Sequence, residues 1–353
     1  MSAEQLAELS DLFVVAAVLL YVVAMVFFAI DLAFGRARPG KAQAARPVEV
    51  KQPVAVGAAV SDEVSAGVSG AVTGSEEAAE KPSGEGAGVA DGTVDGRVDG
   101  RAPGAPAVAA ASGGGAKAGL VALVLAWLGW AANAGAIVTR GLAVDRWPWG
   151  NMYEFVVAIC FAAVTAFLGT QLRHNVRYLG GFVMVTAALG LGLAVKVFYT
   201  AAGPVVPALN SYWIAIHVSA AIISSGLLTL AGVSGVLYLV RRDGESRLPS
   251  RADLEKVAHR AIVFAFPLWT FAVIAGALWA DRAWGRYWGW DPKEVWSFIT
   301  WVAYAAYLHA KVTAGWRGKA ATIVQLVAFG CLLFNLIGVN IFIDGLHSYA
   351  DVD

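Results

Sequence analysis

The chain has 353 residues, of which 58% are hydrophobic and 15% charged, and its mean hydropathy is +0.63. This composition excludes an ordinary soluble globular domain and predicts an integral membrane protein. The formal net charge is zero and says little about partners, among which we expect no nucleic acid.

Apolar runs of about twenty residues, the length that crosses a hydrocarbon core, recur along the chain. Strands of a membrane barrel would be shorter and would alternate in polarity, so these runs predict helices. The expected fold is an all-α integral membrane protein, a polytopic bundle of about eight transmembrane helices. The expected spans lie at roughly 12–34, 118–139, 152–171, 178–196, 212–240, 262–280, 294–312 and 321–343.

A long segment between the first two spans has a different composition. Residues 36–117 contain no Leu, Ile, Met, Phe, Tyr, Trp or Cys. Such a segment cannot bury enough apolar surface to offset its ordering entropy. We therefore expect an N-terminal transmembrane helix (1–35), a disordered cytoplasmic linker (36–117) and a membrane domain (118–353).

The basic residues predict the orientation, because Lys and Arg near span ends stay on the cytoplasmic side. With eight spans, most of the 26 Lys and Arg residues fall in one set of alternate loops. The other set includes the loop between spans six and seven. The pattern predicts a multi-pass protein of the bacterial cell (plasma) membrane, with both termini and this loop facing outward.

The segment around this loop (279–301) is rich in tryptophan. The stretch WGRYWGWDPKEVWSFITW, from Trp284 to Trp301, contains five tryptophans. Within it, Asp291-Pro292-Lys293-Glu294 has the order of a helix start: an N-cap Asp, a first-turn Pro, and a Glu three residues after the cap. We expect the seventh span to begin here, with Gly285 and Gly289 bending the loop before it.

The tryptophans permit two interpretations. Trp and Tyr favour the membrane–water interface, so an aromatic belt is one. The other is a platform of flat indoles for a flat, conjugated ligand such as a porphyrin or a quinone. Arg282, Arg286 and Lys293 could pair with carboxylates of such a ligand, which favours a tetrapyrrole because a quinone has no acid group. The tryptophans alone leave both interpretations open.

Two histidines are expected at the level of the tryptophan segment. His217 lies near the outer start of span five if Asn210 or Ser211 caps that helix, and His347 follows span eight, with Gly345 as the expected helix stop. Two neutral imidazoles can supply the axial ligands of a haem iron. Structural hydrogen bonding is the alternative role for each.

A third histidine is expected at the opposite end of the seventh span. At about 1.5 Å per residue, His309 lies roughly 27 Å along the helix from Asp291. An ionisable residue within a membrane is a functional candidate. The only other histidine expected near that depth is His259, so a haem at His309 would need a ligand from another polypeptide. His174 and His259 are most simply solvated loop residues.

The tryptophan segment also carries a family resemblance. WGRYWGWDPKEVWSF, followed by TWVAYAAYLHAK, is similar to the WWD signature of the haem-handling proteins of cytochrome c maturation. The arrangement over roughly residues 118–350 resembles the CcsA (ResC) branch of system II. The resemblance implies that His217 and His347 ligate haem iron at the outer face, and that His309 ligates it together with a CcsB (ResB) partner. The other implied haem-binding residues are Trp284, Trp288, Trp290, Asp291, Trp296 and Arg286.

The implied work is to present haem b at the outer face and to promote its attachment to the C-x-x-C-H thiols of apocytochrome c, within a holocytochrome c synthase complex. Cys160 and Cys331 lie in separate spans, so the implied partners include thiol-reducing proteins of the pathway besides CcsB and apocytochrome c. We expect no catalytic residue beyond those that position haem. A haem exporter and a haem-containing, quinone-linked respiratory subunit remain alternative functions.

Overall fold

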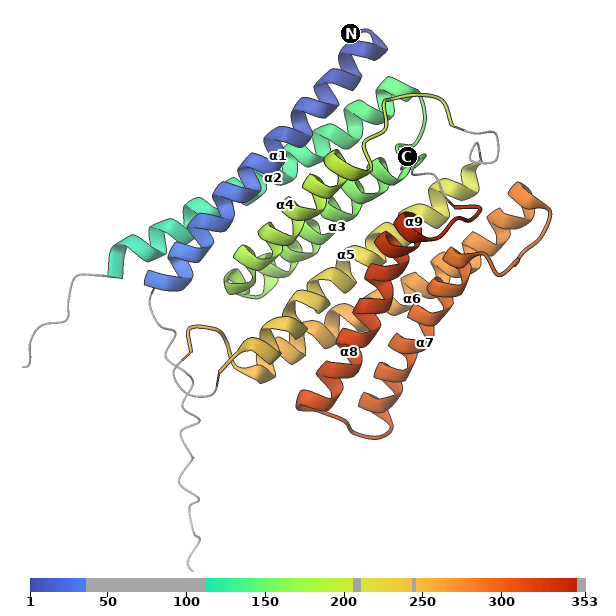
Figure 1. Cartoon of the computed structure of the whole chain (residues 1–353). Coiled ribbons are helices and arrows are strands. Elements are labelled where there is room, and N and C mark those ends of the chain that lie inside the picture. Colours follow the sequence, from blue (N-terminus) through green and yellow to red (C-terminus); the bar gives the residue numbers. More distant parts are fainter. Residues whose placement is uncertain (36–111, 206–210, 243–245, 348–353) are drawn as a thin grey trace, which may run out of the picture. The chain divides into compact units, whose positions relative to one another are not determined.

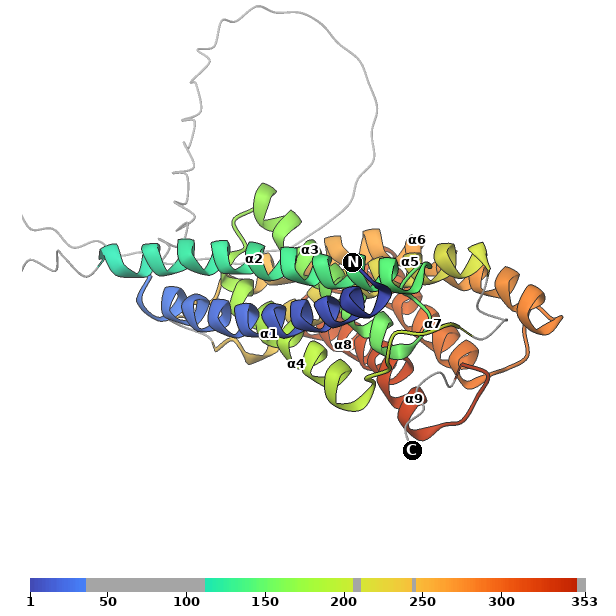
Figure 2. The ribbon, with the colours of Figure 1, turned by 90° about the horizontal axis from the view of Figure 1, so that it is seen from above.

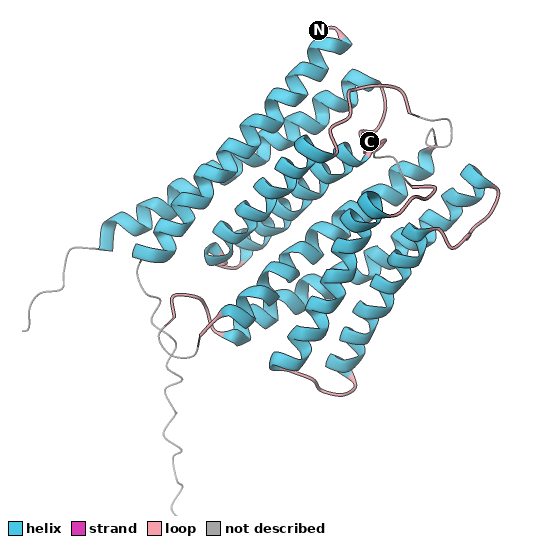
Figure 3. Cartoon of the chain, in the orientation of Figure 1, coloured by secondary structure: helices cyan, strands magenta, loops and turns pink. Residues whose placement is uncertain are grey.

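The structure is a computed structural model that describes residues 1–35, 112–205, 211–242 and 246–347. Within these ranges the regular elements are helices and no strand occurs (Figure 3). The all-α class is therefore confirmed. The elements are α1 (Ala3–Phe34), α2 (Ser112–Val144), α3 (Met152–Arg173), η1 (Arg177–Leu179), α4 (Gly180–Val197), α5 (Tyr212–Val240), α6 (Arg251–Trp284), α7 (Pro292–Val312), α8 (Gly318–Leu333), the π-helical η3 (Phe334–Gly338) and α9 (Val339–Phe342).

Seven helical stretches of the described chain are long and apolar enough to cross a membrane. They are Ala3–Phe34, Lys117–Val144, Met152–Arg173, Arg177–Val197, Tyr212–Val240, Arg251–Trp284 and Gly318–Phe342. They correspond to seven of the predicted spans. The remaining one, α7, has 21 residues, which is enough in length, but it lacks a continuous stretch as apolar as those of the other seven. The protein is thus a multi-pass membrane protein.

Two predicted boundaries differ from the structure. α2 begins at Ser112, before the expected start at 118, and residues 36–111 of the expected linker lie outside the described residues. α6 begins at Arg251, well before 262. Its first turns bury Leu254 and Ala258 and are capped by Ser250, so His259 lies in a helix and its expected loop position is wrong. Hydropathy alone misses helical turns that extend beyond the apolar core of a span.

The helices run side by side with neighbouring chain segments in contact (Figures 1 and 2). α1 packs on α2 and α4, α3 packs on α4 and α5, α5 packs on α6 and α8, and α7 packs on α6 and α8. One apolar core lies mainly among α1–α4 and a second mainly among α5–α8. The N-terminus, the α6–α7 loop and residues 343–347 lie at one end, which we call the tryptophan end (Figure 1).

Local sequence signals set the helix starts at the tryptophan end. Asp291 caps α7 in a complete capping box with Glu294, as predicted, and Ser211 caps α5. Gly285 adopts a φ of 70°, the left-handed conformation that ends α6. The prediction that Gly345 stops the last helix is wrong, because α9 already ends at Phe342. A Cβ at Gly345 would instead lie 2.7 Å from Oδ1 of Asp291, so glycine permits this close approach.

Candidate functional site

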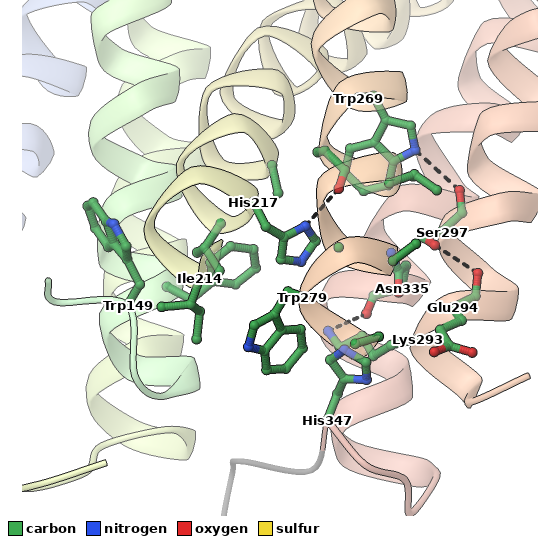
Figure 4. Close-up of a pocket in the computed structure, with 18 of the residues that line it drawn as sticks. Trp149, Ile214, His217, Trp269, Trp279, Lys293, Glu294, Ser297, Asn335 and His347 are labelled. Carbon is green, nitrogen blue, oxygen red and sulfur yellow. Dashed lines mark hydrogen bonds between the residues drawn. The ribbon is translucent and has the colours of Figure 1, made fainter. Parts of the chain in front are cut away.

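A cavity of about 150 Å³ lies at the tryptophan end, between α3, α5, α6, α7 and η3 (Figure 4). Most of its lining is apolar or aromatic, and a few polar groups converge on it. The lining residues used below are Trp149, Asn151, His217, Trp279, Trp284, Trp288, Lys293, Asn335 and His347. An apolar cavity with a few placed polar groups is the usual form of a small-molecule site.

His217 reaches the cavity from the second turn of α5. Its Nδ1 lies 2.8 Å from the backbone oxygen of Ala272 in α6. A carbonyl can only accept, so Nδ1 donates its proton and, in the neutral imidazole, the lone pair lies on Nε2. One turn along α6, a Cβ at Gly276 would lie 2.7 Å from Cε1 of His217. The glycine therefore makes the space in which this imidazole lies.

His347 reaches the same cavity from the segment after α9. Its Nδ1 lies 2.7 Å from Oδ2 of Asp291, which is 6% exposed. Burial by itself would raise the pKa of Asp291, but hydrogen bonds from His347 and from the amides of Leu346 and Lys293 outweigh it and lower the pKa. The ionised carboxylate accepts a hydrogen bond from Nδ1–H of His347, so the lone pair of a neutral His347 also lies on Nε2.

The Asp291 carboxylate therefore accepts hydrogen bonds from three groups. It caps α7 by accepting from the amide of Lys293 at 3.1 Å, and it holds the C-terminal segment by accepting from the amide of Leu346 at 2.6 Å and from His347. Its neighbour Glu294 accepts from the amides of Gly289 and Asp291 at 2.8 and 3.0 Å, which closes the loop onto the helix start. The acid of the tryptophan signature thus fixes the position of a histidine distant in sequence.

Trp279 contacts both imidazoles (Figure 4). Its ring is nearly parallel to that of His217, with centroids 6.2 Å apart and an interplanar angle of 7°. It meets the ring of His347 at 62° with centroids 5.8 Å apart. Trp284 contacts both Trp279 and His347, at 4.7 and 5.0 Å between centroids. Indole rings therefore pack against both histidines.

Of four further site residues predicted in the tryptophan segment, one lines the cavity and three do not. Trp288 lines the cavity. Trp290 is 71% exposed, has a φ of 59° and contacts Trp288 edge-on. Trp296 packs on Phe334 of η3, with centroids 4.2 Å apart. Arg286 is exposed, and its guanidinium lies against Gly289. The last three do not line the cavity, and their part in binding remains a prediction.

His309 lies near the C-terminal end of α7, whereas the cavity is lined by residues at the N-terminal end of this helix. Its side chain is exposed, and its Nδ1 is 3.4 Å from Oγ1 of Thr313. His259 lies on α6 and contacts the hydroxyl of Tyr307 at 3.3 Å. The described residues contain no cluster of three or more His, Cys, Asp or Glu side chains that could hold a metal ion. A ligand set at His309 would need a group from outside this part of the chain.

A buried ion-pair network supports the wall of the cavity formed by Trp149 and Asn151. Glu154, 3% exposed, accepts from Nε of Arg140 at 3.1 Å and from Nη1 of Arg146 at 2.9 Å. It also accepts from the amide of Gly150 at 2.8 Å, and Asn151 caps α3. The turn that carries the two cavity residues is therefore tied to two buried charges, Arg140 and Glu154, and to the partly exposed Arg146.

Sequence reasoning missed the α6 side of the site. Ala272, Gly276 and Ala280 recur every fourth residue on α6, and all three line the cavity, together with Trp279. This stripe of small side chains lies on one helix face and allows close approach. The spacing was visible in the sequence, but such stripes are common in membrane helices and do not by themselves identify a ligand site.

Comparison with known proteins places the chain in a family. The family model described as cytochrome C assembly protein matches residues 149–347, which begin and end on cavity residues. A cytochrome c biogenesis protein CcsA of Synechococcus elongatus is 31% identical over 288 residues, covering 66% of this chain and 87% of the relative. The CcsA of Gloeobacter violaceus is 30% identical over 278 residues, covering 61% and 82%, and that of Chlamydomonas reinhardtii is 40% identical over 225 residues, covering 61% and 64%. The predicted resemblance is confirmed: this chain belongs to the cytochrome c assembly protein family, with CcsA proteins among its relatives, and its role is in cytochrome c biogenesis.

Proposed function

We propose that this protein holds haem b, its substrate, between the imidazoles of His217 and His347 and presents it at the outer face of a bacterial cell membrane. One observation carries the proposal: residues from α5 and from the segment after α9 place two imidazoles in one aromatic cavity. Each is oriented by an Nδ1 hydrogen bond to an oxygen atom. Histidines that bind metals are commonly oriented in this way, with Nε2 directed to the metal.

The cavity must rearrange to admit the ring. Its volume of about 150 Å³ is below the roughly 300–1,000 Å³ of ordinary ligand pockets. Trp279 packs against both imidazoles, so we propose that it moves aside and stacks with Trp284 on the tetrapyrrole. Flat aromatic side chains suit this change because they bury a large area whichever face they present.

The protein then acts by positioning. Holding the vinyl groups where the thiols of apocytochrome c arrive raises their effective concentration. Addition of a thiol to a vinyl group is redox-neutral: the S–H bond breaks, a C–S bond forms, and the proton moves to the other vinyl carbon. The histidine of the client's C-x-x-C-H motif replaces one of the two imidazoles, and the product leaves.

The proposal includes partners. The exposed position of His309 on α7 suits a haem ligand supplied by CcsB (ResB), and thiol-reducing proteins of the pathway keep the client cysteines reduced. Cys160 and Cys331 are free cysteines on α3 and α8, which suits the assignment of that reduction to other proteins. Trp290, Trp296, Arg286 and Asp291 complete the proposed haem-binding set with Trp284 and Trp288.

The test is cytochrome c maturation in cells that supply CcsB, apocytochrome c and reductant, measured by covalent haem staining. We expect His217→Ala and His347→Ala to abolish maturation, and imidazole in the medium to restore part of it. His174→Ala, at the opposite end of the bundle, is the matched control. Normal maturation in both variants, at equal membrane levels, would contradict the ligand assignment. Haem release from cells that lack apocytochrome would instead support an exporter.

A further inference from the structure

We propose that Lys293 binds a propionate carboxylate of haem and thereby sets which edge of the ring faces the client. This inference rests on the proposed function and adds a specific recognition group to it. Lys293 is the second residue of α7 and lines the cavity beside His347 and Asn335 (Figure 4).

The ammonium group of Lys293 has hydrogen-bonding capacity that the protein does not use. Its Nζ donates to the backbone oxygen of Asn335 at 2.9 Å. Among the described residues no carboxylate lies within 4.0 Å of this nitrogen, the limit for a salt bridge. An ammonium has three donors, so two remain for a ligand.

The neighbouring acids are occupied by other groups. Asp291 accepts from His347 and from two backbone amides, and Glu294 accepts from the amides of Gly289 and Asp291. Lys293 is only partly exposed. Removing a cation from water without a bound anion is unfavourable, and an anion that arrives with a ligand reduces that cost. The cavity therefore favours a ligand with a negative group on its α7 side.

The position of Lys293 in the helix adds a second argument. The first turn of a helix carries a partial positive charge, so a lysine there is electrostatically unfavourable. Many polar residues would satisfy the helix start at lower cost, since Asp291 and Glu294 already form the capping box. The π-helical η3 contributes the carbonyl that holds the ammonium in the cavity, and π-helical turns occur frequently at functional sites.

The other cations named from the sequence do not compete for this role. Arg282 and Arg286 are exposed and do not line the cavity. The two propionates are the only acid groups of haem, and they lie on the edge opposite the vinyl groups. A propionate held at Lys293 therefore points the vinyl edge away from α7, where the thiols of a client can reach it.

The experiment compares haem with haem dimethyl ester, whose propionates carry no charge, in binding to the protein purified with its partner subunit. We expect wild type to bind haem roughly 10- to 100-fold more tightly than the ester, the range of a charge-assisted hydrogen bond. Lys293→Met should lose this preference by weakening haem binding alone. Lys293→Arg, which keeps the charge, should retain a preference. Lys196→Met, at an exposed position of α4 that does not line the cavity, is the matched control and should bind like wild type.

Equal affinity of wild type for haem and its ester would overturn the proposal, as would an unchanged preference in Lys293→Met. If Lys293→Met does not fold, the comparison of the two ligands on wild type still decides the question. Failure here is distinct from failure of the proposed function, which would appear as an unchanged haem spectrum in His217→Ala and His347→Ala.

Discussion

Two groups of buried or partly buried charges lie at the tryptophan end, one in each half of the helical domain, and they differ in how they are paired. Glu154 binds Arg140 and Arg146, and these arginines also donate to the backbone oxygens of Thr200 and Gly203. In the other half, Lys293 has a carbonyl oxygen as its hydrogen-bond partner and lies in a cavity with two histidines. Charges that neutralise each other hold loops in place, whereas a cation left for a ligand marks a binding site.

We expect the largest effect on stability from breaking the ion pairs of Glu154. Glu154→Gln removes the nearest carboxylate from the buried Arg140, whose other acid, Asp11, lies 3.9 Å away, and from the partly exposed Arg146. Breaking a buried ion pair typically costs about 3–5 kcal/mol. We expect a large fall in thermal stability, measured in detergent without haem. Glu8→Gln, at an exposed position of α1, removes the same charge and should leave the stability unchanged. If both variants unfold alike, the network is not structural.

A change beside the two histidines should lower haem affinity and leave stability nearly unchanged. Asp291→Asn keeps a good N-cap residue, so we expect little change in stability. It weakens the hold on Nδ1 of His347, and loss of such a partner typically lowers metal affinity or activity about 10- to 100-fold. Titration of haem into the purified protein measures the affinity. A loss of stability as large as that of Glu154→Gln would show that Asp291 acts mainly in folding.

A smaller and more local effect is expected on α6. Gly276→Ala places a methyl group 2.7 Å from Cε1 of His217, and overpacking of this kind typically costs about 1–3 kcal/mol. Because alanine also favours the helix, we expect the damage to appear in haem affinity more than in stability. Gly192→Ala on α4, where a Cβ meets no atom within 4 Å, is the matched control and should bind haem normally.

Much of this organisation could be predicted from the sequence because the signals are local. Apolar length defined the spans, and the order Asp291-Pro292-Lys293-Glu294 defined the start of α7. The placement of His217 and His347 at one end followed from counting alternate spans. The structure brings them to one cavity, which the count alone could not establish.

The remaining features depend on contacts between distant segments. No local pattern indicates that Trp279 contacts two imidazoles, that Gly276 makes space for His217, or that Glu154 binds two arginines. The sequence named three cations as carboxylate partners, and only the fold distinguishes Lys293, inside the cavity, from the exposed arginines. Gly345 was assigned a local role in helix termination, whereas its contact with Asp291 is tertiary.

The most direct test of the account is the visible absorption spectrum of the haem-loaded protein, purified with its partner subunit. If His217 and His347 share one iron atom, wild type should show six-coordinate haem, and each alanine variant should lose one ligand and regain it on addition of imidazole. A spectrum that is the same in wild type and in both variants would contradict the central claim that this cavity binds haem through two histidines.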